Sequence, residues 1–282
     1  MIRRPASPPG GRRVDLHAHT FFSDGLLSPE DLVARALDKH LLALAVTDHD
    51  TVEALPRARA AATAQIELVP GIELSSATDG VDLHILGYYL DPEHPRLRTR
   101  LERFQDERRQ RAVLMMQRLN DLGATLDPDE VFDLAGPGVV GRPHVAGALL
   151  RAGHVSSMDE AFKRYLGPQG AAYVPRPAFR PEEAIALIHE ADGVSVLAHP
   201  GASLPDSLLE RLVAAGLRGV EVWHPQHNAA TIRRYRALAS RLGLLETGGS
   251  DFHGHPRGAD LGDLGVPAAV LDPLKAAAGV SG

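Results

Sequence analysis

Short apolar runs alternate with longer helical patterns along much of the chain, and this alternation restricts its fold more than any other feature. The runs that we expect to be strands are residues 13–19, 41–50, 66–76, 81–90, 193–200, 219–225 and 244–254. A well-formed helix start lies between the first two, where Ser28 can cap a helix and Pro29 occupies its first position. Strands that alternate with helices form a parallel sheet covered by helices, so we expect an α/β fold.

The alternation is interrupted in the middle of the chain, from Pro92 onward. Residues 95–122 form an arginine-rich amphipathic pattern that predicts one long helix, and shorter helical segments follow it. The rhythm of strands and helices then resumes. We therefore expect a barrel built from residues 13–92 and 173–282, with an all-helical insertion at 93–172.

Composition and charge exclude several classes of protein. The chain has 282 residues, 44% of them hydrophobic, which suits an α/β barrel with a large core. It has no cysteine, so disulfides, thiolate metal sites and a cysteine nucleophile are excluded. The formal charge of −6 argues against a broad electrostatic grip on nucleic acid or membranes, and the longest apolar run, residues 41–46, is too short to cross a bilayer. Residues 1–12 have paired arginines without an apolar segment, so we expect a disordered leader and a cytoplasmic protein.

Histidines and carboxylates recur where the expected strands end. In VDLHAHTFFSDG, His17 and His19 close the first strand and point to the same side, because side chains alternate along a strand. A single histidine such as His84 is more often a hydrogen-bonded core residue, and a Ser-Asp-Gly turn is more often only a turn. The joint occurrence at strand ends, where α/β barrels build their active sites, instead predicts a metal cluster. The nine predicted ligands are His17, His19, Asp24, His49, Glu73, His84, His199, Asp251 and His253.

The chemistry of these side chains restricts both the ions and the substrate. Imidazoles and carboxylates without thiolates suit Mn²⁺, Fe²⁺, Co²⁺ or Zn²⁺ better than Mg²⁺ or Ca²⁺. Each ion needs roughly four to six donors, some of them water, so nine side chains with a bridging carboxylate serve two or three ions. Such a centre carries a strong positive charge and favours an anion. Phosphoester hydrolysis is therefore the expected reaction.

The motifs DLHAHTFFSDG, AVTDHDT, PGIELSS, HILGYYL, VLAHPG and GSDFHG occur in this order and resemble those of the PHP (polymerase and histidinol phosphatase) family of metal-dependent phosphoesterases. The resemblance covers about residues 14–256. It implies a distorted (β/α)₇ barrel and a cluster of three divalent ions, with Mn²⁺ as the expected metal. It also implies three ligand sets, namely His17, His19, Glu73 and Asp251; Glu73, His84 and His199; and Asp24, His49 and His253. Within the cluster, the resemblance gives catalytic roles to His17, His19, Glu73, Asp251 and His253.

The insertion indicates a branch of this family. GRPHVAGALL, followed by AFKRYL and placed between HILGY and AHP, resembles the branch of 3′,5′-nucleoside bisphosphate phosphatases and RNase AM-type 5′→3′ exoribonucleases. The resemblance implies hydrolysis of the 3′-phosphate of a substrate such as pAp, and short 5′-phosphorylated RNA as a further substrate. It implies that the helical insertion covers the metal site as a substrate lid. No membrane and no stable protein partner are expected.

Basic residues of the insertion are candidates for binding a second phosphate. Arg108 and Arg111 are three residues apart and share a helix face, although a solvated helix surface would account for them equally well. Arg142 and His144 stand at the start of a helix, where anions bind favourably. The predicted substrate ligands are Arg108, Arg111, Arg142, His144, Lys163 and His227.

Four other functions remain open from the sequence. The same cluster would serve a histidinol-phosphate phosphatase, and 5′→3′ ribonuclease activity could be the main role. An amidohydrolase-type C–N hydrolase also begins with HxH, but it normally uses a lysine on a mid-barrel strand, and no lysine lies at an expected strand end. A structural metal module is disfavoured because structural sites are closed cages with four ligands.

Overall fold

The computed structural model describes residues 12–78, 81–255 and 258–280, so nearly all of the expected leader lies outside the described residues. The strands are β1 (Arg13–Asp15), β2 (Ala43–Val46), β3 (Glu67–Thr78), β4 (Val81–Tyr88), β5 (Val194–Leu197), β6 (Gly219–Trp223), β7 (Leu245–Gly248) and β8 (Val266–Pro267). The helices are α1 (Pro29–Asp38), α2 (Leu55–Ala61), α3 (Pro95–Asp121), α4 (Pro128–Ala135), α5 (Arg142–Arg151), α6 (Met158–Ala161), η1 (Phe162–Leu166), α7 (Pro181–Glu190), α8 (Asp206–Ala214), α9 (Ala229–Leu242), η2 (Ala268–Val270) and α10 (Leu271–Ala277). None of the described helices is long and apolar enough to cross a membrane.

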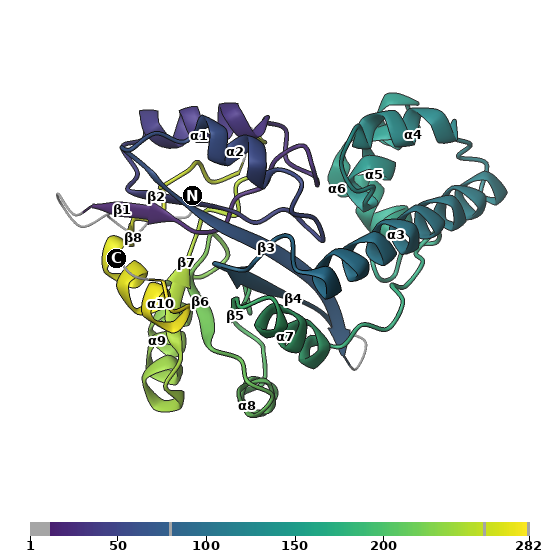
Figure 1. The fold of residues 1–282 in the computed structure, drawn as a ribbon. Coiled ribbons are helices and arrows are strands. Elements are labelled where there is room, and N and C mark those ends of the chain that lie inside the picture. The colour runs from purple at the N-terminus through teal and green to yellow at the C-terminus, as the bar shows by residue number, and fades with distance from the viewer. Residues whose placement is uncertain (1–11, 79–80, 256–257, 281–282) are drawn as a thin grey trace.

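The strands form one eight-stranded sheet in the order β7-β6-β5-β4-β3-β2-β1-β8, which curls into a nearly closed barrel (Figure 1). The amide of Leu16, just after β1, donates to the carbonyl of Gly248 in β7 over 3.1 Å. This hydrogen bond joins β1 to β7 and so closes the barrel. Gly249 permits this close approach, because a Cβ on it would lie 2.3 Å from the backbone nitrogen of His17. Strands β2 and β5 are wholly buried, as expected for strands covered on both faces.

The direction of β4 differs from the parallel sheet that the sequence predicts. This strand pairs antiparallel with both β3 and β5. The reason is the length of the connection: only two residues separate β3 from β4, whereas a parallel crossover needs a dozen or more. His84 therefore stands in the first half of its strand, and not at a carboxyl end as expected, yet it lies at the same mouth of the barrel as Glu73.

Helix α1 begins as its sequence predicts. The side chain of Ser28 accepts a hydrogen bond from the amide of Asp31, and Pro29 opens the first turn. Asn228 caps α9 in the same way by accepting from the amides of Ala230 and Thr231. These local interactions fix where the covering helices begin.

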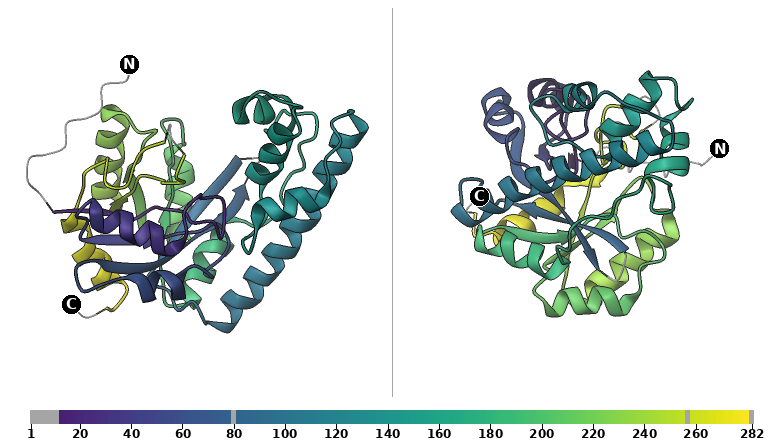
Figure 2. Two further views of the ribbon diagram at one scale, coloured as in Figure 1. Left: turned by 90° about the horizontal axis from the view of Figure 1, so that it is seen from above. Right: turned by 90° about the vertical axis from the view of Figure 1, so that its right-hand side faces the viewer.

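The insertion stands beside the barrel, and α3 runs from the barrel to the far end of the insertion (Figures 1 and 2). The first half of α3 packs Leu97, Leu101 and Phe104 into the main core of the barrel. Its second half contributes Met115 and Leu119 to a separate apolar core, all of whose buried residues lie between positions 112 and 174. Helix α3 therefore joins two cores and holds the small helical unit against the barrel.

Candidate metal centre and substrate site

All nine predicted ligands gather at one mouth of the barrel, and the fully buried carboxylate of Glu73 lies at their centre. Glu73 Oε1 lies 2.8 Å from His84 Nδ1 and 2.9 Å from His199 Nε2. Its other oxygen, Oε2, lies 3.2 Å from His17 Nε2 and 3.0 Å from His49 Nδ1. One carboxylate thus faces histidines that come from β4, from the ends of β5 and β2, and from the segment after β1.

Asp251 completes a first group of donor atoms. Its Oδ1 lies 3.3 Å from His17 Nε2 and 3.2 Å from His19 Nε2, and His19 Nε2 is 3.3 Å from Glu73 Oε2. One ligand atom from each of His17, His19, Glu73 and Asp251 lies within 4.8 Å of the others. Asp251 has a φ of 50°, a strained value for a residue other than glycine. Such strain is found where the surrounding structure fixes a functional side chain.

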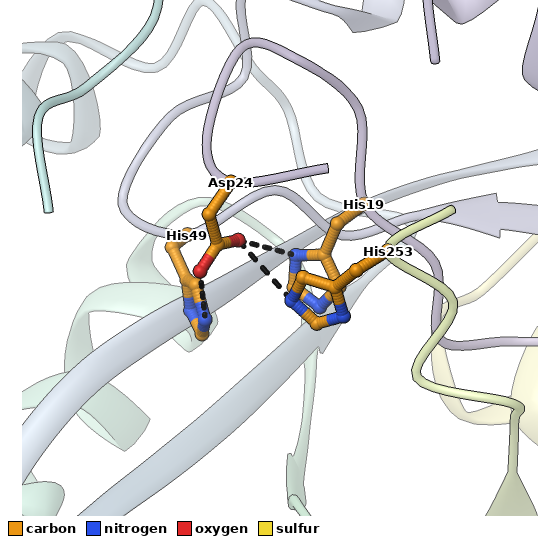
Figure 3. A group of neighbouring side chains, drawn as sticks. All are labelled: His19, Asp24, His49 and His253. Atoms are coloured by element: carbon orange, nitrogen blue, oxygen red, sulfur yellow. Dashed lines mark ion pairs between the residues drawn. The ribbon is translucent and has the colours of Figure 1, made fainter. Parts of the chain in front are cut away.

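Asp24 is the centre of a second group, together with His19, His49 and His253 (Figure 3). Asp24 Oδ1 lies 3.2 Å from His253 Nε2 and 3.9 Å from His19 Nδ1, while Oδ2 lies 3.9 Å from His49 Nε2. His49 also contacts Glu73 through its other ring nitrogen. Its imidazole therefore stands between the two carboxylates.

A third group consists of His49, Glu73 and His84. The family resemblance instead assigns His199 to the ion held by Glu73 and His84. His199 does contact Glu73, although it is not part of this group. The distribution of the nine side chains among individual ions remains a prediction.

The cluster has the electrostatics of a cation site. Burial opposes the charged form of His17, but the carboxylates of Glu221, Glu73 and Asp251 raise its pKa well above the usual value. His19 is also buried, yet hydrogen bonds to Asp251 and Glu73 raise its pKa to about 10. Despite their own burial, the pKa values of Glu73 and Asp251 are held well below normal, chiefly by His49 for the first and His17 for the second. The carboxylates are therefore ionised and attract positive charge.

Several buried ligand atoms at the centre have oppositely charged neighbours but no well-aligned hydrogen bond. Among the described residues these include His19 Nε2, Asp24 Oδ1 and His49 Nδ1. A buried polar atom without a partner is costly unless something else binds it. Because imidazole and carboxylate lone pairs converge here, the residues fit divalent transition-metal ions.

Glu221, which the sequence analysis did not identify, orients two of these ligands. Its Oε1 lies 3.1 Å from His17 Nδ1, and its Oε2 accepts a hydrogen bond of 2.7 Å from the backbone amide of His199. A carboxylate in this position fixes the proton on Nδ1 and leaves Nε2 of His17 free to bind a metal. The only signal in the sequence is one acidic residue within the apolar run GVEVW.

Asp48 is a second supporting carboxylate that the sequence analysis missed. It accepts hydrogen bonds of 2.7 Å from both the amide and the hydroxyl of Thr20, and one of 2.6 Å from the hydroxyl of Ser23. These bonds shape the loop that carries Asp24.

His224 lies at the centre, whereas the predicted ligand His227 lies behind it. His224 Nε2 is 3.3 Å from Asp251 Oδ2. Both ring nitrogens of His227 bond within the protein: Nδ1 lies 2.9 Å from the carbonyl of Val222, and Nε2 accepts from the amide of Gly201. His227 therefore offers no free nitrogen to a substrate in this arrangement.

Arginines of α3 lie beside the metal centre. Arg108 pairs with Asp50, just beyond β2, and donates to Ser75 Oγ over 3.1 Å. Arg111 donates through Nε to the carbonyl of Val174, and its buried Nη2 has no hydrogen bond among the described residues. Both line one cavity with Ser75 and Asp50.

Arg176, in the segment after the insertion, lies in the same cavity and was not predicted. Its buried Nε has no hydrogen bond among the described residues. Burial, followed by the charge of Arg108, lowers the pKa of Arg176 to about 10, and burial, followed by Arg176, lowers that of Arg111 to about 9. We call Arg108, Arg111 and Arg176 the guanidinium cluster. Its three guanidinium groups lie close together, and Asp50 pairs with Arg108.

Arg142 and His144 stand at the start of α5. Arg142 Nη2 lies 3.4 Å from Asp82 Oδ2. Nδ1 of His144 accepts from the amide of Gly141 over 2.9 Å, so its proton is on Nε2. Burial lowers the pKa of His144, although the charge of Asp24 acts to raise it. His144 is therefore a neutral hydrogen-bond donor near the guanidinium cluster.

Lys163, the remaining predicted substrate ligand, is exposed on η1. It follows Phe162, whose ring lies 5.9 Å from the guanidinium of Arg142. Lys163 therefore stays near the predicted binding surface, but its role remains a prediction.

Comparisons with known proteins agree with this geometry. The PHP domain profile matches residues 15–132. The chain is 37% identical over 265 residues to the 5′-3′ exoribonuclease Rnm of Salmonella typhimurium, covering 91% of this chain and 90% of that protein. It is 34% identical over 254 residues to a 3′,5′-nucleoside bisphosphate phosphatase of Chromobacterium violaceum, covering 85% of this chain and 87% of the relative.

A solved structure has the same fold. The crystal structure of a protein from Bifidobacterium adolescentis, assigned as a metal-dependent phosphoesterase, superimposes on this chain with a TM-score of 0.89 at 30% identity. The match covers 96% of this chain and 98% of the other. Both the barrel and the helical insertion therefore lie within the region of likeness.

Proposed function

The chain belongs to the PHP family of metal-dependent phosphoesterases, and on that basis we propose that it hydrolyses the 3′-phosphate of 3′,5′-nucleoside bisphosphates such as pAp. Short 5′-phosphorylated RNA, cut from its 5′ end, is the related substrate. The observation that supports the proposal is the guanidinium cluster, whose positive charges beside the metal centre would favour a second phosphate. We also propose a cytoplasmic location, because nucleotides and RNA ends are present there.

We propose that the nine converging side chains hold three divalent ions, with Mn²⁺ as the expected metal. Bound ions would lower the pKa of a water molecule, making it a nucleophile at neutral pH, and would offset the charge of the phosphate oxygens. Glu221 and Asp48 hold the ligands in place by the hydrogen bonds described above. The protein side chains thus supply a rigid site before the substrate arrives.

The residues around the metal centre bind and orient the rest of the substrate. In the proposed complex, the guanidinium cluster attracts the 5′-phosphate, and Arg111 Nη2 and Arg176 Nε, which have no hydrogen bond among the described residues, donate to its oxygens. The Nε2–H of His144 donates to a phosphate oxygen. Residues at the start of α5, near the centre, would also restrict the access of bulk water.

Two alternative enzymes are less compatible with the site. Histidinol phosphate carries an ammonium group and a single phosphate, so the guanidinium cluster would repel the first and lack a second anion to bind. An amidohydrolase would need a lysine on a barrel strand. The three lysines of the chain are Lys39, Lys163 and Lys275, and none of them lies in a strand.

The test compares pAp with 3′-AMP, which lacks the 5′-phosphate, using protein loaded with Mn²⁺. Without that phosphate, the buried arginines stay unpaired, so we expect kcat/KM to fall by about 100-fold or more. Arg176→Gln should lower kcat/KM for pAp by a similar factor and change that for 3′-AMP much less.

Arg180→Gln is the matched control, because Arg180 lies in the same segment and is 69% exposed. It should behave as the unmodified protein. Equal rates on pAp and 3′-AMP would contradict the proposed anion site. Faster hydrolysis of histidinol phosphate than of pAp would overturn the proposed substrate.

A further inference from the structure

A second cavity opens beside the metal centre, on the side of β4 and β5. Its volume is about 630 Å³, within the range of roughly 300–1,000 Å³ that small-molecule sites occupy. We call it the β4–β5 groove. Its polar lining residues are Thr78, Asp82, His84, His199, Ser203, Ser207 and Arg211.

The groove and the guanidinium cluster lie on different sides of Glu73. The cavity of the cluster is lined by Ser75 of β3 and by Asp50, just beyond β2, whereas the groove is lined by Thr78 at the end of β3, by β4 and by the segment after β5. The two cavities share β3, and their other strands lie on opposite sides of it in the order β5-β4-β3-β2. Because His84 and His199 line the groove and contact Glu73 Oε1, the metal centre itself forms part of its wall.

The lining of the groove suits a nucleotide better than a free phosphate. Pro200, Leu204 and Leu208 supply apolar surface on which a base can pack. Arg211 is 45% exposed, lies 3.2 Å from Glu182 Oε1 and donates to Thr78 Oγ1 over 2.8 Å. Its guanidinium is thus held at the edge of the groove, where it can bind a backbone phosphate.

We propose that the β4–β5 groove binds the nucleotide that follows the scissile phosphate in an RNA chain. This inference rests on the proposed function and adds a binding site for the RNA substrate. In pAp, the 3′-phosphate carries no further group, and a site for pAp alone needs no groove there. In 5′-phosphorylated RNA, the same phosphate is esterified to the O5′ of the next nucleotide, and this nucleotide requires the space.

The same bond breaks in both substrates. Water adds to phosphorus, the P–O3′ bond breaks, and O3′ takes up a proton. From pAp the products are AMP and inorganic phosphate. From RNA they are a 5′-mononucleotide and a chain whose new 5′-phosphate stays on its O5′, so this chain is a substrate for the next cycle.

The test uses pAp and the dinucleotide pApA, which differ only in the adenosine esterified to the 3′-phosphate. Ser203→Trp places a large ring in the groove. We expect it to lower kcat/KM for pApA by at least about tenfold and to leave that for pAp within about twofold, since only the dinucleotide loses its binding space. Retained activity on pAp shows that the variant is folded. Ser240→Trp, at an exposed position of α9, is the matched control and should change neither rate.

The outcomes separate this inference from the proposed function. If Ser203→Trp lowers both rates equally or leaves that for pApA unchanged, the groove does not bind the following nucleotide. Cleavage of pAp without cleavage of pApA by the unmodified protein would also overturn the inference. If neither substrate is cleaved, the proposed function itself fails.

A second variant tests the charge at the edge of the groove. Arg211→Gln should reduce the salt dependence of kcat/KM for the trinucleotide pApApA. The slope of log(kcat/KM) against log salt concentration should become smaller by about 0.7, because one phosphate contact to a single strand is lost. The slope for pAp should not change. Arg241→Gln is the control, because Arg241 is 52% exposed and pairs with Glu210 in a similar surface position. An unchanged slope for pApApA would show that Arg211 does not bind a backbone phosphate.

Discussion

Buried carboxylates at the mouth of the barrel have two different tasks. Glu73, Asp24 and Asp251 face the imidazoles, and each lies near two or more ring nitrogens. Glu221 and Asp48 instead accept hydrogen bonds from the residues that form the site. The two tasks differ because of the hydrogen-bond partners of each carboxylate. A carboxylate that is already paired with backbone amides and hydroxyls has fewer lone pairs left to bind a metal ion.

Glu221→Gln should weaken metal binding without dismantling the centre. Glutamine keeps the shape but loses the negative charge that holds the proton of His17 on Nδ1. We expect the affinity for Mn²⁺ to fall by roughly 10–100-fold, with most of the rate on pAp recovered at saturating Mn²⁺. Titration of activity and calorimetric binding with Mn²⁺ measure this. Glu246→Gln, on neighbouring β7, should bind as the unmodified protein does, and equal affinities of all three proteins would refute the role of Glu221.

Among the elements, α1 is tied to the C-terminal segment by Asp260. The guanidinium of Arg35 donates to both carboxylate oxygens of Asp260, over 2.6 and 2.8 Å, and Lys39 pairs with the same group. Burial opposes the ionisation of Asp260, but the hydrogen bonds from Arg35 and Lys39 lower its pKa to about 2. The pair of Arg35 and Asp260 joins residues 225 positions apart in sequence.

Asp260→Asn should lower the free energy of unfolding by about 1 kcal/mol at pH 6, after allowance for the partial exposure of the pair. Because the folded pKa is depressed, the stabilisation is present above about pH 4 and is lost as the pH falls towards 2, with roughly half of it gone at pH 3. Urea unfolding of both proteins at pH 6, 4 and 3 gives the difference. Asp133→Asn, an exposed position of α4, should show no such trend. A difference independent of pH would mean that the charge of Asp260 is not responsible.

For the whole molecule, the centre joins the two ends of the barrel. Its donors run from His17, just after β1, to His253, beyond β7. Bound ions would therefore bridge segments that the sheet itself connects through few hydrogen bonds. Their removal should affect the stability of the entire barrel.

Chelation should lower the melting temperature of the protein by about 10 °C relative to protein with Mn²⁺ at about 1,000 times its dissociation constant, because such binding stabilises the folded state by about 4 kcal/mol. Differential scanning calorimetry with and without chelator measures the shift. Restored Mn²⁺ should reverse it, whereas Mg²⁺ at the same concentration should not. Equal melting temperatures with and without Mn²⁺ would argue against ions at this centre.

Local chemistry in the sequence determined much of this protein. The cap at Ser28, the buried run of β2 and the long pattern of α3 depend on neighbouring residues, and the helices and strands lie close to where they were expected. The donor types at the strand ends predicted which nine residues gather, because so many carboxylates and imidazoles at one end of a barrel would pack poorly in an apolar core.

Only the tertiary structure decided the direction of β4, the choice of His224 over His227, and the supporting roles of Glu221 and Arg176. Each depends on contacts between residues far apart in the chain, and no local pattern records them. Glu221 is a single acidic residue in an apolar strand until His17, 204 positions away, is brought against it. The sequence thus specifies which groups can act, and packing decides which of them meet.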